Sequence, residues 1–260
     1  MRWYQYGMVI GLILLGFELM IVFPNMTNKY ENKPNVPETN TEQGVMYKLS
    51  DIHSSGRPDG TGPKEWEVWA DEATRIYGAD SMDVQRVRTK FFGEKGLQFV
   101  VVGRKGLVNE KDLNLRIEGN VITKSSNGYE FRTEWMTYAS KARELTTESS
   151  VEMFGPNTRA QFHLQGEGMK ADLRTGVITV LRQVKAKKTV ENSEQTINIE
   201  SREAQFSGRN HQTIFRNDVT MDVDSVRVTG REAVFQFGQT GGEVESILVQ
   251  GSVRVSDLDK

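Results

Sequence analysis

The chain has 260 residues, of which 33 are basic and 35 acidic, for a formal net charge of −2, and it contains no cysteine. The balanced charge argues against a nucleic-acid partner, and the missing thiols exclude a disulfide framework and a cysteine-linked lipoprotein anchor. Hydrophobic residues make up 37% and aromatic residues 9%, which is modest for a chain that must fill a thick core of its own.

An apolar run occupies residues 8–23, with Glu18 as its only charged side chain. As a helix it would span about 24 Å at 1.5 Å per residue, close to the thickness of a bilayer core. No small-x-small cleavage site follows, since the next residues are Pro24 and Asn25, and this favours an uncleaved anchor over a signal peptide. We predict a cytoplasmic N-terminus and transmembrane anchor over 1–23, with Arg2 favouring an exported body.

Glu18 allows two interpretations. A carboxylate inside an apolar span is costly, so it commonly faces a partner helix or a water-filled cavity. Five residues separate it from Phe23, however, which is about 8 Å by helix rise and near enough for the side chain to reach the interface. We favour the interfacial position, and Glu18 is the candidate contact to a membrane partner under the alternative interpretation.

Residues 24–63 have the composition of a flexible linker. Five of the six prolines of the chain lie there, among Asn, Thr, Glu and Gly. Such a segment cannot bury enough apolar surface to offset its ordering entropy. We predict a linker over this range. Within it, residues 45–52 are expected to add one strand to the folded body.

A unit of about thirty residues recurs six times after residue 65. Each copy opens with a small residue and reaches a valine 17 or 18 positions later, or 23 in the last copy, where 238–242 form a loop insertion. The six pairs are Ala70 with Val87, Gly103 with Val121, Thr133 with Val151, Gly166 with Val184, Ser201 with Val219, and Gly230 with Val253. A fixed period is typical of stacked supersecondary units.

Within each unit, apolar and polar side chains alternate, which places one apolar set on a single strand face. Each unit therefore predicts two strands joined by a turn. A small residue inside a strand is typical of a bulge or sharp bend, so six regularly spaced bends predict an all-β fold, an elongated β-jellyroll made of one rolled antiparallel sheet. Periodicity leaves open whether the interior is a filled sandwich core or an apolar furrow.

Candidate chemistry is sparse. His53, His163 and His211 do not have the spacing of metal ligands, and Asp222 and Asp224 are too few for calcium, so we interpret them as a solvated strand face. Gly103 and Gly106 lack the length of a phosphate loop, and the basic run at 185–188 is interpreted as a turn between sheets. We predict no enzyme activity, cofactor or metal. A β-helical polysaccharide enzyme ranks last, since no paired carboxylates recur.

Several short motifs follow one another along the chain: the apolar run, WEVWADEA at 66–73, RIEGNV at 116–121, NGYEFRTE at 127–134 and LQGEGM at 164–169. Together they resemble the LptC family of lipopolysaccharide export. This resemblance covers 1–188. The last two units, with IESREAQF at 199–206 and GREAVF at 230–235, are more similar to the related LptA or OstA domain. We therefore predict an LptC-like β-jellyroll over 64–188 and a fused LptA/OstA-like β extension over 189–260.

The resemblance implies a protein of the inner membrane, with a single span and a periplasmic C-terminal domain, that binds lipopolysaccharide. The implied partners are an ABC transporter of two membrane subunits and an ATPase, and an LptA-like bridge protein or outer-membrane receptor joined by edge-strand pairing. The acyl chains would be shielded from water, at about 0.8 kcal/mol per methylene, by an alternating apolar set. The predicted lining residues are Trp66, Val68, Leu115, Ile117, Phe131, Val151, Met153, Phe162, Leu164, Ile178, Val180, Ile199, Phe206 and Val228.

A membrane-anchored envelope scaffold with a filled sandwich is the alternative function, in which the same apolar residues are only core. The covalent extension also leaves open whether it replaces a separate bridge protein or docks one.

Overall fold

A computed structural model describes residues 44–57, 62–155, 162–189, 195–207, 210–238 and 244–258. The predicted anchor over 1–23 and Glu18 lie outside these residues. Among the described residues, no helix has the length and apolar character needed to cross a bilayer.

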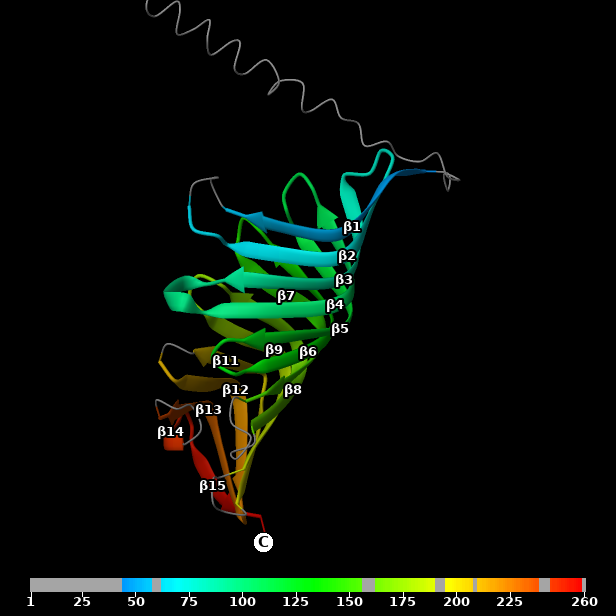
Figure 1. The fold of residues 1–260 in the computed structure, drawn as a ribbon. Helices are drawn as coiled ribbons and strands as arrows, with labels where there is room; N and C mark the ends of the chain where they lie inside the picture. Colours follow the sequence, from blue (N-terminus) through cyan, green and yellow to red (C-terminus); the bar gives the residue numbers. More distant parts are fainter. Residues whose placement is uncertain are drawn as a thin grey trace, which may run out of the picture. The chain divides into compact units, whose positions relative to one another are not determined.

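The described part of the chain folds into one antiparallel sheet of fifteen strands (Figure 1). The strands are β1 (Val45–Gly56), β2 (Trp66–Ile76), β3 (Ser81–Phe92), β4 (Gln98–Asn109), β5 (Leu115–Ser125), β6 (Glu130–Ala139), β7 (Glu144–Phe154), β8 (Phe162–Asp172), β9 (Val177–Thr189), β10 (Thr196–Ser201), β11 (Glu203–Ser207), β12 (Gln212–Val223), β13 (Val226–Phe237), β14 (Val244–Gln250) and β15 (Arg254–Asp257). One turn of 3-10 helix, η2 (Glu94–Gly96), joins β3 to β4. The predicted all-β class is confirmed, and the sheet is consistent with a β-jellyroll.

The six predicted units are six pairs of consecutive strands. Four are simple hairpins, β2–β3, β4–β5, β6–β7 and β8–β9. In the fifth, β10 and β11 both pair with β9 and β12, so together they act as one interrupted strand. In the sixth, β14 and β15 both pair with β13 in the same way. β1 is the strand predicted at 45–52; it runs on to Gly56 and occupies part of the range predicted as a linker.

The small residues and valines of the repeat lie opposite one another on neighbouring strands. The observed pairs are Val87 with Gly103, Val121 with Thr133, Thr133 with Val151, Val151 with Gly166, Val184 with Ser201, and Val219 with Gly230. Register shifts interrupt the ladders beside this row, for example between Glu118 and Val121 and between Thr147 and Ser150. Bulges of this kind bend strands, so the row marks a bend that crosses the sheet.

Space at the bend explains the small residues. A Cβ added at Gly103 would lie 2.4 Å from Ile117 Cγ2, and one added at Gly166 would lie 2.5 Å from Val180 Cγ1 and 3.0 Å from the Arg182 carbonyl oxygen. A larger residue at either position would therefore force its neighbours to shift, at a cost in stability.

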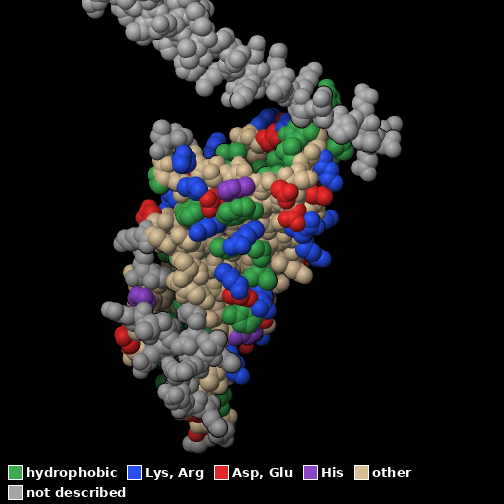
Figure 2. All heavy atoms as spheres, viewed as in Figure 1, with side chains coloured by type: hydrophobic (Ala, Val, Ile, Leu, Met, Phe, Trp, Pro, Cys, Tyr) green, Lys and Arg blue, Asp and Glu red, His purple; other side chains and the backbone are tan. Residues whose placement is uncertain are grey.

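The bend brings the inward-facing side chains of distant strands together. Phe91 of β3 packs against Tyr138 of β6, with ring centroids 4.4 Å apart, although these strands are not neighbours in the sheet. Phe162 of β8 and Phe206 of β11 likewise meet at 6.0 Å. The apolar face of one sheet thus packs on itself, while charged side chains are spread over the outer surface that Figure 2 shows.

Candidate functional site

The predicted lining residues all belong to the single apolar cluster inside the sheet. Eleven of the fourteen are buried, and Trp66, Val68 and Val228 are partly buried and packed against the others. They come from nine strands, which are β2, β5, β6, β7, β8, β9, β10, β11 and, for Val228, β13. Period-two alternation therefore identified which side chains share the inner face. Whether they contact a lipid stays a prediction.

The inner face also contains residues that the sequence prediction left out. Phe91, Phe99, Phe215 and Phe235 are each at most 1% exposed, and Tyr138 is 2% exposed. The signal was present, because Phe91 follows Val87 and Thr89 at intervals of two and all three are buried. These rings fill much of the interior, so most of it is packed with the protein's own side chains.

An apolar cavity remains near the N-terminal edge of the sheet. Its volume is about 210 Å³, and its walls include Ile52, Trp66, Val68, Phe91 and Tyr138, from β1, β2, β3 and β6. Ligand pockets typically hold about 300–1,000 Å³. The cavity could accept a segment of an acyl chain, but a whole multi-chain lipid would require the interior to widen.

The polar groups in and beside this cavity are uncharged or paired, and the wall carboxylate Glu110 forms an ion pair with Arg75. Burial, reinforced by the Glu65 carboxylate, raises the pKa of Tyr138 to about 12, so its phenol is neutral at physiological pH. The Glu65 carboxylate is 7% exposed, and its Oε1 lies 3.0 Å from Nε of Arg143. No free charge is therefore presented to the apolar space by these groups.

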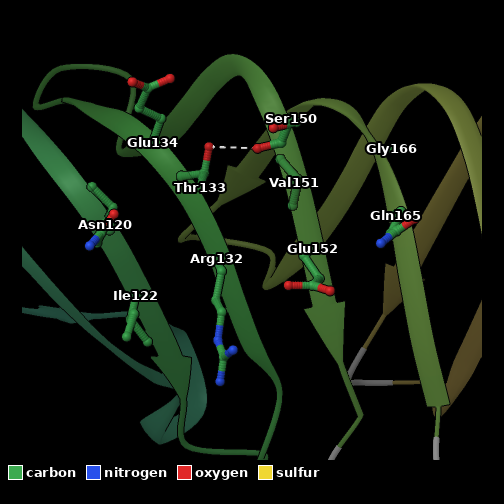
Figure 3. A pocket seen from close by; sticks show the side chains of 11 residues that line it. Asn120, Ile122, Arg132, Thr133, Glu134, Ser150, Val151, Glu152, Gln165 and Gly166 are labelled. Carbon is green, nitrogen blue, oxygen red and sulfur yellow. Dashed lines mark hydrogen bonds between the residues drawn. The ribbon is translucent and has the colours of Figure 1, made fainter.

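A larger hollow of about 690 Å³ lies on the outer side of the bend, across β5 to β8 (Figure 3). Its side chains are mostly polar, including Asn120, Arg132, Glu152 and Gln165, and Thr133 Oγ1 donates a hydrogen bond of 2.8 Å to the Ser150 carbonyl oxygen. The hollow follows from the bulges, which open the outer surface where the strands bend. Charged side chains stand among its walls, whereas the smaller inner cavity is almost entirely apolar and is the better lipid site.

The remaining polar candidates are structural. His163 Nε2 lies 2.8 Å from Glu152 Oε1, and His53 stacks on Trp69. Asp222 accepts two hydrogen bonds of 2.7 Å from Arg227, which lower the pKa of its carboxyl. Within the described ranges, no group of three or more His, Asp or Glu side chains is placed to bind a metal ion.

The basic run at 185–188 is not a turn, as the sequence suggested, but part of the long strand β9. Lys185 and Lys187 point outward, whereas Lys188 is 3% exposed and its Nζ lies 5.8 Å from the centre of the Phe237 ring. The error has a simple cause, because alternation in a strand sends one lysine of such a run inward.

Comparison with protein families decides the identity. The LptC family, described as lipopolysaccharide-assembly, LptC-related, matches residues 12–189, which is more than half of the chain. The chain belongs to the LptC family. This places it in lipopolysaccharide transport and agrees with the sequence resemblance. A comparison with curated proteins gave no match.

The LptC match ends at Thr189, the last residue of β9, but the sheet does not end there. β10 pairs with β9 from Thr196–Thr189 to Ser201–Val184, and β11 pairs with the other half of β9. The residues beyond the LptC match therefore continue the same ladder and the same bend.

Both ends of the sheet carry an unpaired strand edge and exposed apolar side chains. β1 pairs with β2 alone, and β14 and β15 pair with β13 alone, among the strands that the structure describes. Met46 and Leu49 on β1 are 56% and 47% exposed, and Leu248 and Val255 at the other end are 58% and 68% exposed. Open edges of this kind are templates for pairing with another strand.

Proposed function

We propose that this LptC-family chain is a membrane-anchored component of the lipopolysaccharide transport bridge. It accepts lipopolysaccharide from an inner-membrane ABC transporter and passes the acyl chains along the inner face of the sheet toward the outer membrane. The observation that carries the proposal is the single apolar cluster that extends from Ile52 on β1 to Val249 on β14. A continuous apolar inner face favours hydrocarbon transfer, because each shielded methylene saves about 0.8 kcal/mol.

The free edges support the proposed partners. An edge strand with exposed apolar side chains can add a strand from a second protein, and main-chain hydrogen bonds then extend the sheet. We assign the β1 edge to a membrane subunit of the transporter. The β14–β15 edge is assigned to an LptA-like bridge protein or to an outer-membrane receptor.

The proposed location follows from the sequence and the family. The apolar run at 8–23 serves as a single-pass anchor in the inner membrane, and the sheet lies in the periplasm. Glu18 remains the proposed contact to a membrane partner. The segment over 189–260 is proposed to be an LptA/OstA-like extension of the bridge.

The packed interior favours a second candidate, an envelope scaffold with no lipid path. Phe91, Phe131 and Met153 are at most 1% exposed, and side chains that close-pack like a core leave no room for a guest. Under this hypothesis the cavity of about 210 Å³ is an ordinary packing defect.

Photocrosslinking separates the two functions. A photoreactive amino acid replaces Phe131 or Phe162 in the full chain in cells, and covalent adducts with lipopolysaccharide are measured by immunoblotting. Arg132, the outward neighbour of Phe131 on β6, is the matched control position. We expect capture at 131 and 162 and little at 132. Absence of capture at both inner positions, with the protein folded, would favour the scaffold.

A further inference from the structure

Opposite the bend, strand ends from distant parts of the sheet come into contact. On one side are Glu65, at the start of β2, and Phe92 and Gly93, at the end of β3. On the other are Arg143, in the turn between β6 and β7, and Leu173, in the turn after β8. A Cβ added at Gly93 would lie only 2.6 Å from the Leu173 carbonyl oxygen. We call this line of contact the seam.

Arg143 connects the two sides of the seam. Its Nη2 donates a hydrogen bond of 3.0 Å to the Phe92 carbonyl oxygen, and its Nε lies 3.0 Å from Glu65 Oε1. The Nε–H is buried and not aligned on an acceptor, so the pair with Glu65 is held by charge rather than by a well-formed hydrogen bond. Arg143 thus retains an unsatisfied donor in the closed sheet.

The backbone at Arg143 is also unusual. Its φ is +54°, in the left-handed region that Gly and Asn adopt more readily. The turn is closed by Arg143 N donating to the Ser140 carbonyl oxygen, and Leu173 N donates to the carbonyl oxygen of Arg143. With both its N–H and its carbonyl oxygen bonded, the backbone of Arg143 is fixed where the side chain crosses the seam.

The seam lies directly over the apolar cavity. Phe91, next to Phe92, and Tyr138 form part of the cavity wall, and their tilted rings pack with centroids 4.4 Å apart. Glu65 precedes Trp66, another wall residue, and its charge acts on Tyr138. If the seam parted, a chain entering this cavity would leave its polar head beside Arg143.

Opening at the seam is easier than opening at the bend. The bend is crossed by continuous strands with backbone ladders on both sides, whereas the seam contacts reported above are side-chain and turn contacts. The main obstacle is the buried charge, because a guanidinium removed from Glu65 must find another anion. A ligand with an anionic head group supplies that anion.

We propose that the seam is a lateral entrance for the lipid, and that Arg143 is the site that binds the lipid's anionic head group. An oxyanion, either phosphate or carboxylate, replaces Glu65 as the partner of Arg143 while the hydrocarbon enters the cavity. The planar guanidinium suits both groups, since each can accept two parallel hydrogen bonds. This inference rests on the proposed lipid-transfer function and adds where the lipid enters and which residue receives its head.

The first test uses charge variants with opposite expected effects. The readout is capture of detergent-dispersed lipopolysaccharide by the purified full chain with the photoreactive group at 131. Glu65→Gln frees Arg143 and should increase capture, whereas Arg143→Gln should reduce it about tenfold, the ratio that one lost charge-assisted contact gives. Capture by Arg143→Lys should lie between that of the wild type and that of Arg143→Gln. If Arg143 merely seals the seam, both Gln variants loosen it and capture rises in both, which overturns the head-group assignment.

The chemistry of the head group is resolved by comparing lipids. With dephosphorylated lipopolysaccharide, wild type and Arg143→Gln should capture equally if phosphate is the partner. If wild type still captures more dephosphorylated lipopolysaccharide than Arg143→Gln does, the group that binds Arg143 is a carboxylate of the lipid. Either result supports the oxyanion site, but equal capture of both lipids by both proteins would contradict it. Circular dichroism confirms that each variant is folded, and Arg143→Lys preserves the test if Arg143→Gln is unstable.

A second test locks the seam. The chain has no cysteine, so Glu94→Cys with Arg174→Cys provides one pair, adjacent to the touching residues Gly93 and Leu173. A short, cleavable bismaleimide joins them. We expect capture at 131 to be lost on linking and restored on cleavage, with each single-cysteine variant as control. Unchanged capture in the linked protein would show that lipid enters from the ends, while the transfer function stands. No capture by the unlinked protein would instead refute the transfer function.

Discussion

The part of the sheet that matches the LptC family, β1 to β9, and the part beyond it, β10 to β15, are built in the same way but differ inside. The first contains the apolar cavity, the seam at Arg143 and the paired carboxylate Glu65. The second continues the bend through Ser201, Val219 and Gly230 and packs Phe215 against Phe235, with ring centroids 5.4 Å apart. The family boundary is therefore a boundary of sequence similarity. It is not a boundary of the fold, because β9 is shared by both parts.

If the two parts form one cooperative sheet, a core substitution beyond the match should destabilise both. Phe206 of β11 contacts Phe162 at 6.0 Å and Tyr129 at 6.3 Å, both in the LptC-matched part. We expect Phe206→Ala to lower the free energy of unfolding by about 3–5 kcal/mol. Denaturant unfolding followed by far-UV circular dichroism, which reports on both parts, and by tryptophan fluorescence, which reports on the matched part, should show one coincident transition that shifts as a whole. Leu248→Ala, at a residue 58% exposed, is the control with little change. Two separate transitions would show that the parts unfold independently.

The bend should be less tolerant in the centre of the sheet than near its end. A Cβ at Gly166 would lie 2.5 Å from Val180 Cγ1, and one at Gly230 would lie 2.7 Å from Val249 Cγ1. β14, which carries Val249, has a free edge and can shift, whereas β9 is held by neighbours on both sides. We expect Gly166→Ala to cost about 1–3 kcal/mol of stability and Gly230→Ala clearly less, measured by thermal unfolding. Gly238→Ala, where the nearest atom is a flexible Glu245 oxygen at 3.3 Å, is the control. Equal losses at 166 and 230 would contradict this ranking.

Alkaline pH should destabilise the sheet through tyrosine of the LptC-matched part, because no tyrosine follows Tyr138 in the chain. The folded pKa of Tyr138 is about 12, above its ordinary value of 10.0. Between pH 10 and pH 12 the phenol of Tyr138 is deprotonated in the unfolded chain but not in the folded chain. The free energy of unfolding therefore falls as pH rises through this range. One such group lowers the free energy of unfolding by about 1.4 kcal/mol for each pH unit within this range. Unfolding at pH 9 to 11.5 should show a shallower decline in Tyr138→Phe than in wild type; parallel declines would disprove the assignment.

Surface ion pairs should contribute least in both parts. Arg227 lowers the pKa of Asp222 beyond the match, and Arg132 with Lys124 lowers that of Glu130 within it. Depressed carboxyl pKa values add stability above the unfolded pKa that is lost as pH falls. Because these groups are largely solvated, Asp222→Asn and Glu130→Gln should each cost no more than about 1 kcal/mol, and less in high salt. A salt-independent loss of several kcal/mol at either site would show that the pair is effectively buried.

Much of the fold could be predicted because its signals are local. Alternation identified the inward face, and the spacing from Gly103 to Val121 or from Gly166 to Val184 located the bend on each strand. Turn placement was less secure, as the lysines of β9 show. A run of charged residues looks like a turn, yet the ladder partners of Lys188, Phe162 and Ile197, keep it in the sheet. The large rings Phe91 and Tyr138 were omitted from the predicted site because nothing local says that they meet.

What the sequence determined by itself is a set of amphipathic strands with small residues at regular bends, preceded by an apolar run, in an order that resembles LptC. These properties depend on side-chain period and size, which can be read residue by residue. Only the tertiary structure decided how full the interior is, where the cavity remains and that Arg143 meets Glu65 across 78 positions of the chain. Those features depend on how far the sheet curls. The curl sums many small bends and brings together residues whose separation in sequence carries no trace of their contact.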